Sequence, residues 1–186
     1  MGQRLLHWGP LTAIGITLII GIATTYLHLL WWPPTTFAAF LHLSFFLFFN
    51  YLSLVNLVRS AFFGPGYVPN NWKPPRPEDE PRLQYCRSCG GFKVPRSHHC
   101  SKCGRCILKM DHHCRSLHLF LRIKLKIHFD FQTWINNCVG HRNHALFVRF
   151  LAASTAGCIH AVVIILCGLY RLLYRVRNIF FEIVSE

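Results

Sequence analysis

The stretch that decides the fold is residues 86–114, which read CRSCGGFKVPRSHHCSKCGRCILKMDHHC. Two residues separate Cys86 from Cys89, Cys100 from Cys103, and Cys103 from Cys106. This spacing lets a tight turn place two thiolates on one edge of a tetrahedron, which suits a zinc ion. Disulfide bonds between these cysteines are the alternative, and the choice depends on the compartment that the segment faces.

Long apolar runs lie on both sides of this segment. No Lys, Arg, Asp or Glu occurs in residues 5–58, a run of 54 residues, or in residues 150–170, a run of 21 residues. A membrane-crossing helix needs about 20 apolar residues. The first run is long enough for two helices, and the Trp-Trp-Pro-Pro at residues 31–34 favours a turn at a membrane interface. We therefore predict spans near residues 10–31, 37–60 and 147–171.

The composition agrees with a membrane protein. The chain is 52% hydrophobic and only 15% charged, whereas soluble domains have about 25% charged residues. This excludes an ordinary soluble domain, and the 15% aromatic content is unlike that of a disordered chain. A cleaved signal peptide is disfavoured because the apolar run exceeds the usual core of about 7 to 15 residues and a second span follows.

The basic residues predict the orientation. Residues 59–149 contain 16 of the 20 Lys and Arg residues, and loops rich in these residues face the cytosol. Cytosolic thiols are kept reduced, so we interpret the cysteines as metal ligands rather than disulfides. Three spans would leave the C-terminus on the lumenal or outer side, where Arg171, Arg175 and Arg177 are unusual.

The predicted fold class is an all-α membrane protein with three transmembrane helices and a cytosolic, loop-rich, two-zinc cysteine-rich domain between the second and the third. We predict a helical hairpin over residues 1–63 and an extended, Pro-rich linker over residues 64–81. The zinc-binding domain is predicted over residues 82–146, and the third transmembrane helix with a short tail over residues 147–186.

The cysteine-rich domain offers more ligands than two zinc sites need. The candidates are Cys86, Cys89, His98, His99, Cys100, Cys103, Cys106, His112, His113, Cys114 and Cys138. Two four-coordinate sites leave at least one thiol over. A leftover thiol beside Asp and His can be a nucleophile, because Cys needs an adjacent base or cation to become a thiolate at neutral pH.

The residues 111–114, Asp-His-His-Cys, together with the cysteine pattern before them and the later Asn137-Cys138-Val139-Gly140 and Asn143, resemble the cysteine-rich domain of the DHHC-type protein S-acyltransferases, or palmitoyltransferases. The resemblance implies two zinc sites, the first made by Cys86, Cys89, His99 and Cys106 and the second by Cys100, Cys103, His113 and Cys138. It also implies catalytic roles for Cys114, His112 and Asp111.

In the implied mechanism, Cys114 takes palmitate from palmitoyl-CoA as a thioester and passes it to a cysteine of a target protein. His112 is the implied base and Asp111 orients it. The residues alone leave a second interpretation open, in which Asp111 is instead the partner of zinc-bound His113.

The same resemblance implies partners and a location. We expect contact with membrane lipid, long-chain acyl-CoA and substrate proteins that carry cytosolic juxtamembrane cysteines, no nucleic acid, and homo- or hetero-oligomers as an open question. The linker and the N-terminal segment are similar to the endoplasmic-reticulum branch of the family, so we expect that membrane, with the Golgi as the alternative.

Two features depart from the family pattern. Twenty-three residues separate Cys114 from Cys138, where the family has a much shorter stretch, and the insertion 115–132 alternates apolar and polar residues, which predicts a half-buried strand. The family usually has four spans, and this sequence predicts three. The alternative prediction is therefore a catalytically impaired form that acts as a noncatalytic membrane binding partner.

Overall fold

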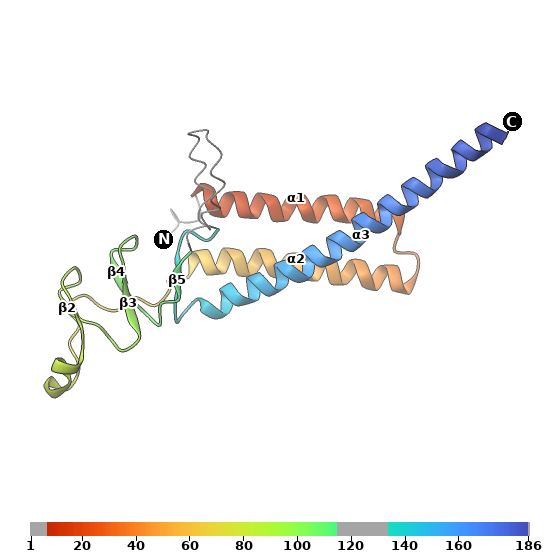
Figure 1. Ribbon diagram of the computed structural model, residues 1–186. Helices are drawn as coiled ribbons and strands as arrows, with labels where there is room; N and C mark the ends of the chain where they lie inside the picture. The colour runs from red at the N-terminus through yellow and green to blue at the C-terminus, as the bar shows by residue number, and fades with distance from the viewer. Residues whose placement is uncertain (1–6, 115–133, 186) are drawn as a thin grey trace, which may run out of the picture. The chain divides into compact units, whose positions relative to one another are not determined.

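The computed structural model describes residues 7–114 and 134–185. Its three long helices are α1 (Trp8–Trp31), α2 (Phe37–Phe62) and α3 (His144–Ser185), and all three are long and apolar enough to cross a membrane (Figure 1). The chain is an integral membrane protein with three candidate spans, and the predicted fold class is confirmed. α3 continues well beyond the predicted end at residue 171, because no Gly or Pro follows Gly168 to stop it.

Close contacts divide the chain into two units. One comprises the described parts of Met1–Ile14 and Val55–Arg149, and the other the described parts of Gly15–Leu54 and Phe150–Glu186. The first contains the cysteine-rich domain, and the second contains most of the helical spans.

Several polar side chains of the helical unit are buried, and many of its apolar side chains are exposed. Thr24 and Ser53 are 2% exposed, whereas Ile19 and Ile22 are about 70% exposed. The Ser53 and Ser154 hydroxyls lie 2.7 Å apart in a hydrogen bond between α2 and α3. Polar groups in lipid must find partners inside the protein, and apolar side chains can face the lipid tails, so this distribution is the one expected of spans in a bilayer.

Aromatic rings from all three helices also meet in this unit. The ring of His42 on α2 lies 4.8 Å from that of His160 on α3 and 5.9 Å from that of His28 on α1, measured between centroids. The indole of Trp32 lies 5.5 Å from both His28 and His42. These ring contacts tie together the helix segments near the turn between α1 and α2.

The cysteine-rich domain consists of three short two-stranded antiparallel sheets joined by turns. The strands are β1 (Tyr85–Cys86) with β2 (Gly91–Phe92), β3 (Ser97–Cys100) with β4 (Arg105–Leu108), and β5 (His112–His113) with β6 (Cys138–Val139). The loop-rich prediction did not include these pairs, which are too short to be stable alone. Their buried clusters consist largely of cysteines.

The linker is more ordered than an extended connection. The backbone N–H of Val68 donates to the carbonyl of Cys106, and the N–H of Leu108 donates to the carbonyl of Gly66. Residues 66–68 therefore run beside β4. The far end of the predicted extended linker is also helical, because Pro77–Arg82 form a 3-10 helix, η2. A proline in its first turn and three acidic residues there suit a helix N-terminus.

The strand predicted from the alternation in residues 115–132 lies outside the described residues.

Two buried asparagines join the end of α2 to β6 and the start of α3. The Asn137 amide nitrogen donates to the carbonyl of Phe63 at 2.7 Å and to those of Ser60 and Ala61 at 3.3 Å. The Asn143 amide nitrogen donates to the carbonyls of Ser60, Phe63 and Cys138. The last carbonyls of a helix have no partner within the helix, and these amides supply the partners for α2.

We predict that Asn143→Leu lowers the free energy of unfolding by about 2 kcal/mol or more, because it leaves buried carbonyls and the Gly140 N–H without partners. The midpoint of thermal unfolding in detergent checks this. Asn70→Ala, at an exposed position, is the control. Asn143→Asp keeps the acceptor but loses the donors and should be as destabilising; equal midpoints for all three variants and the parent chain would contradict the prediction.

Candidate metal centres and thiol site

The first cluster of metal-ligating side chains combines Cys86, Cys89, His99 and Cys106, whose donor atoms all lie within 4.8 Å of one another. The His99 Nδ1 atom is 3.5, 3.3 and 3.9 Å from the sulfurs of Cys86, Cys89 and Cys106. Two local features position these groups. His99 and Cys106 are cross-strand partners on β3 and β4. A turn in which the Cys89 N–H donates to the Cys86 carbonyl places Cys89 near Cys86, and Gly90, at φ +66°, continues this turn.

The second cluster combines Cys100, Cys103, His113 and Cys138 in the same way. The His113 Nδ1 atom is 3.4, 3.5 and 3.1 Å from the sulfurs of Cys100, Cys103 and Cys138. His113 and Cys138 are cross-strand partners on β5 and β6. Since neighbouring strand residues point to opposite sides, β3 gives His99 to one cluster and Cys100 to the other.

The geometry of both clusters fits a tetrahedral metal ion. With bonds of about 2.3 Å to sulfur and 2.0 Å to nitrogen, the edge from sulfur to nitrogen of a zinc site is about 3.5 Å, which is close to the observed distances. All nine cysteines lie in the described residues and none is in a disulfide. The disulfide alternative therefore finds no support, and the two Cys/His clusters are consistent with metal binding.

The electrostatics of the clusters point the same way. The hydrogen bond from Cys138, with His113 nearby, lowers the pKa of Cys103 to about 4, and the same hydrogen bond raises the pKa of Cys138. In the other cluster, burial beside Cys86 and Cys89 raises the pKa of Cys106 to about 12. Crowded thiols thus resist losing all their protons together, and a bound dication would compensate three thiolates.

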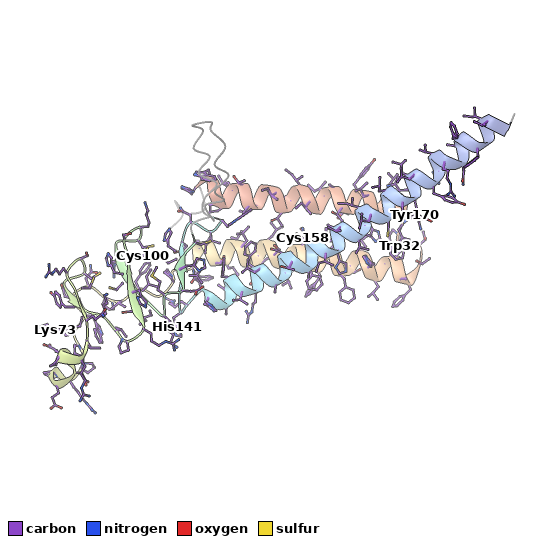
Figure 2. The ribbon with its side chains drawn as sticks, viewed as in Figure 1. Trp32, Lys73, Cys100, His141, Cys158 and Tyr170 are labelled. Carbon is purple, nitrogen blue, oxygen red and sulfur yellow. The ribbon has the colours of Figure 1, made fainter. Side chains whose placement is uncertain are left out.

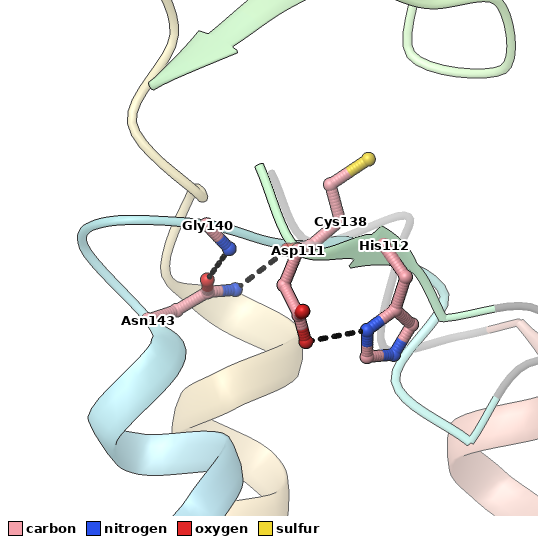
Figure 3. Close-up of polar contacts among 5 residues, drawn as sticks. All are labelled: Asp111, His112, Cys138, Gly140 and Asn143. Atoms are coloured by element: carbon pink, nitrogen blue, oxygen red, sulfur yellow. Dashed lines mark hydrogen bonds and ion pairs between the residues drawn. The ribbon is translucent and has the colours of Figure 1, made fainter. Parts of the chain in front are cut away.

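Asp111 and His112 form a pair next to the second cluster. The Asp111 Oδ2 atom lies 2.9 Å from the His112 Nδ1 atom (Figure 3), so the carboxylate contacts His112, the arrangement that the catalytic interpretation requires. The side chains are 56% and 41% exposed, respectively. The His112 ring also packs edge-on against Phe147, with centroids 5.3 Å apart.

The Cys114 thiol lies outside both clusters and is 5% exposed. Its backbone N–H donates to the carbonyl of Asn137 at 3.1 Å, which extends the pairing of β5 with β6. Burial raises the pKa of the Cys114 thiol, and hydrogen bonds from the backbone N–H groups of Ile135 and Trp134 oppose this rise. A thiol in this state needs a base to react at neutral pH.

Eight predicted ligands are thus brought together in the two predicted groups, and the predicted acid–histidine pair is in contact. The sequence interpretation gave no role to Asn137 and Asn143, which anchor this site. Figure 3 shows Asn143 between the N–H of Gly140 and the carbonyl of Cys138. The only sequence signal for these anchors was the presence of two asparagines close to the Cys-Val-Gly of residues 138–140.

Comparison with protein families gives a match to the DHHC palmitoyltransferase family over residues 79–120 and 128–186. The chain belongs to this family. The match confirms the resemblance that the cysteine-rich segment carries.

Individual relatives agree. The mouse and human proteins named Palmitoyltransferase ZDHHC6 are each 40% identical over 176 residues, which is 93% of this chain and 38% of theirs. Probable protein S-acyltransferase 16 of Arabidopsis thaliana is 34% identical over 143 residues, 71% of this chain and 41% of its own. The chain thus spans about two-fifths of the length of these relatives.

We predict that single substitutions remove one metal ion at a time. Cys86→Ala should leave about one bound zinc per chain, and so should Cys100→Ala, because each cluster loses one of its four ligands. Both changes should also lower stability, since structural zinc contributes about 10 to 16 kcal/mol to folding. Metal analysis of purified protein checks the count. Cys158→Ala, outside both clusters, is the control and should retain two; a parent chain without zinc would contradict the assignment.

Proposed function

We propose that this chain is a protein-cysteine S-palmitoyltransferase that acts through a thioester on Cys114. The observation that carries the proposal is the thiol of Cys114, which lies outside both Cys/His clusters and three residues from Asp111, whose carboxylate contacts His112. Family membership supports the acyl donor, palmitoyl-CoA, and an acceptor cysteine in a substrate protein.

In the proposed first half-reaction, His112 takes the proton of Cys114, and the thiolate attacks the carbonyl carbon of palmitoyl-CoA. The carbon–sulfur bond to CoA breaks, and the leaving sulfur receives the proton from His112. In the second, an acceptor thiol gives its proton to His112 and attacks the thioester carbon, and Cys114 leaves and regains a proton. Asp111 keeps the His112 Nδ1 atom occupied, so that Nε2 handles the protons.

We further propose that the eight clustered residues hold two structural zinc ions. The ligands are Cys86, Cys89, His99 and Cys106 for the first and Cys100, Cys103, His113 and Cys138 for the second. Bound zinc would supply cross-links between short strands and offset two of the three thiolate charges in each cluster. The pairing of β5 with β6 would hold the backbone of Cys114 opposite Asn137, next to the second cluster.

The proposed setting is a cytosolic cysteine-rich domain at the surface of the endoplasmic-reticulum membrane. The basic loop supports the orientation, and the similarity to that branch of the family supports the organelle. A bilayer site suits the substrate, because each buried methylene of the acyl chain contributes about 0.8 kcal/mol, and the tail can stay in an apolar environment while the CoA head stays in water.

We predict that the purified chain, incubated with labelled palmitoyl-CoA, forms a hydroxylamine-sensitive adduct that Cys114→Ser abolishes. A serine at this place lacks the sulfur needed for a thioester. Gel fluorography with and without hydroxylamine measures the adduct. Cys167→Ser should keep it, and both variants should bind two zinc ions.

A parent chain that binds two zinc ions but forms no adduct would favour the noncatalytic binding partner instead. The deletion of residues 115–132 then tests whether the insertion causes the missing adduct. An adduct restored by the deletion would assign the loss to the insertion.

We predict that His112→Gln slows adduct formation by about 10² to 10⁴-fold, because the general base is lost, and that Asp111→Asn slows it less. Initial rates with saturating palmitoyl-CoA check the order. Asp79→Asn, a half-buried acid on η2 and outside the site, is the control and should match the parent rate. Equal rates for His112→Gln and Asp79→Asn would refute the assigned roles.

A further inference from the structure

The helical unit has a groove between the end of α1 and the middle of α3, which we call the α1–α3 groove. It consists of two adjoining hollows of about 470 and 420 Å³ that share Trp31, Tyr170 and Arg171. One hollow is mainly apolar and is lined further by Trp32, Ile164 and Cys167. The other is lined further by Tyr174 and Arg175 and is more polar. Figure 2 labels Trp32 and Tyr170, which both line the first of these hollows.

Two contacts fix the walls of the groove. The Arg171 Nη1 atom donates to the carbonyl of Trp31, the last residue of α1, so this guanidinium is held in place rather than free to move with the solvent. A side chain on Gly168 would begin 3.2 Å from the Trp31 ring. Glycine therefore permits the close approach of α3 to α1.

Neither Arg171 nor Arg175 forms an ion pair with a side chain that the structure describes. The acidic side chains at residues 78–80 and 111 belong to the other unit. A guanidinium has five N–H donors in a planar fork. One donor of Arg171 caps α1, and the others remain for a planar or tetrahedral anion.

The residues around the groove are typical of the depth of a lipid headgroup. Arg171 ends the uncharged run of residues 150–170, and Trp31 and Trp32 begin the turn between α1 and α2. Tryptophans prefer the membrane interface, and arginines near helix ends reach the same layer. The polar hollow thus faces the headgroup layer, and the apolar hollow lies along α3 toward its uncharged run.

We propose that the α1–α3 groove binds one anionic phospholipid of the bilayer. The phosphate contacts Arg171 and Arg175, with the hydroxyls of Tyr170 and Tyr174 beside it, and an acyl chain lies along Ile164 and Cys167. The match of a cationic, donor-rich end to an apolar end is the match that an anionic amphiphile requires. The site uses none of the residues assigned to acyl transfer and is independent of the proposed function.

The test uses the full chain, purified in a mild detergent and supplied with phosphatidylglycerol or phosphatidylcholine, with bound lipid counted by native mass spectrometry. We expect one tightly bound phosphatidylglycerol and no comparable phosphatidylcholine. The double variant Arg171→Gln with Arg175→Gln should lower the bound fraction at least about fivefold, the effect of roughly one basic residue near a lipid surface.

Arg177→Gln is the matched control. Arg177 lies on the same helix but stacks on Tyr174, 5.0 Å from its ring centroid, and does not line the groove. It should change lipid binding less than twofold. Equal losses in the control and the double variant would reduce the effect to general attraction of basic residues to anionic lipid and would overturn the proposal.

Two further variants keep the test decisive if the double glutamine variant does not fold. Replacing both arginines with lysine keeps the charges and should retain most of the binding, whereas Cys167→Trp fills the apolar hollow and should displace the lipid with the arginines intact. Displacement of the lipid by millimolar inorganic phosphate, preference for a free fatty acid, or binding by Cys167→Trp equal to that of the parent chain would each overturn the proposal.

Discussion

The interaction on which the position of the cysteine-rich domain's last strand depends is the capping of α2 by the amides of Asn137 and Asn143. Each side chain is 0% exposed, and each donates to carbonyls at the end of α2 and accepts a backbone N–H with its oxygen. Asn143 also begins the turn into α3, where the N–H of Phe147 bonds to its carbonyl. The two residues thus determine where α2 ends, where β6 lies and where α3 begins.

The cysteine-rich domain shows why such an anchor is needed. Its strands are two to four residues long, and its buried clusters contain more cysteine than aliphatic side chains. A domain with so little apolar core is normally stabilised by metal or disulfides. Because the described thiols form no disulfides, the domain must be stabilised by the eight donor residues of the two clusters and by hydrogen bonds to the linker and the helix ends.

The sequence predicted the parts of the fold that depend on local pattern. The uncharged runs predicted the three helices because a bilayer requires length and apolarity, and the two-residue cysteine spacings predicted clusters because they fix local geometry. The assignment of His99 rather than His98 required the family resemblance. Spacing does not determine which of two adjacent histidines faces the first cluster. The register of β3 against β4 determines it, because His99 is the cross-strand partner of Cys106.

Other features depend on long-range contacts and were not predictable. Residues 66–68 pack beside β4 because unpaired backbone groups there match those of Cys106 and Leu108, and no sequence pattern announces such a match. The roles of Asn137 and Asn143 depend on carbonyls more than seventy residues earlier in the chain. The length of α3 was underestimated because the arginines after Tyr170 were read as the end of a span, whereas arginine is a good helix former.

The position of Cys114 bears on whether the inserted residues disturb the site. Backbone pairing runs from Asp111, whose N–H donates to the carbonyl of Val139, to Cys114, whose N–H donates to the carbonyl of Asn137. Both ends of the intervening stretch are therefore closed by the same ladder, and Asn137 is itself fixed to α2. A connection between His113 and Cys138 that is roughly four times as long as that of the family costs only about 1.2 kcal/mol of closure entropy. A structural zinc ion would contribute about 10 to 16 kcal/mol to folding. The backbone of the thiol can keep its register while the connection between Cys114 and Cys138 lengthens, so the longer connection does not by itself displace Cys114 from the β5–β6 pairing.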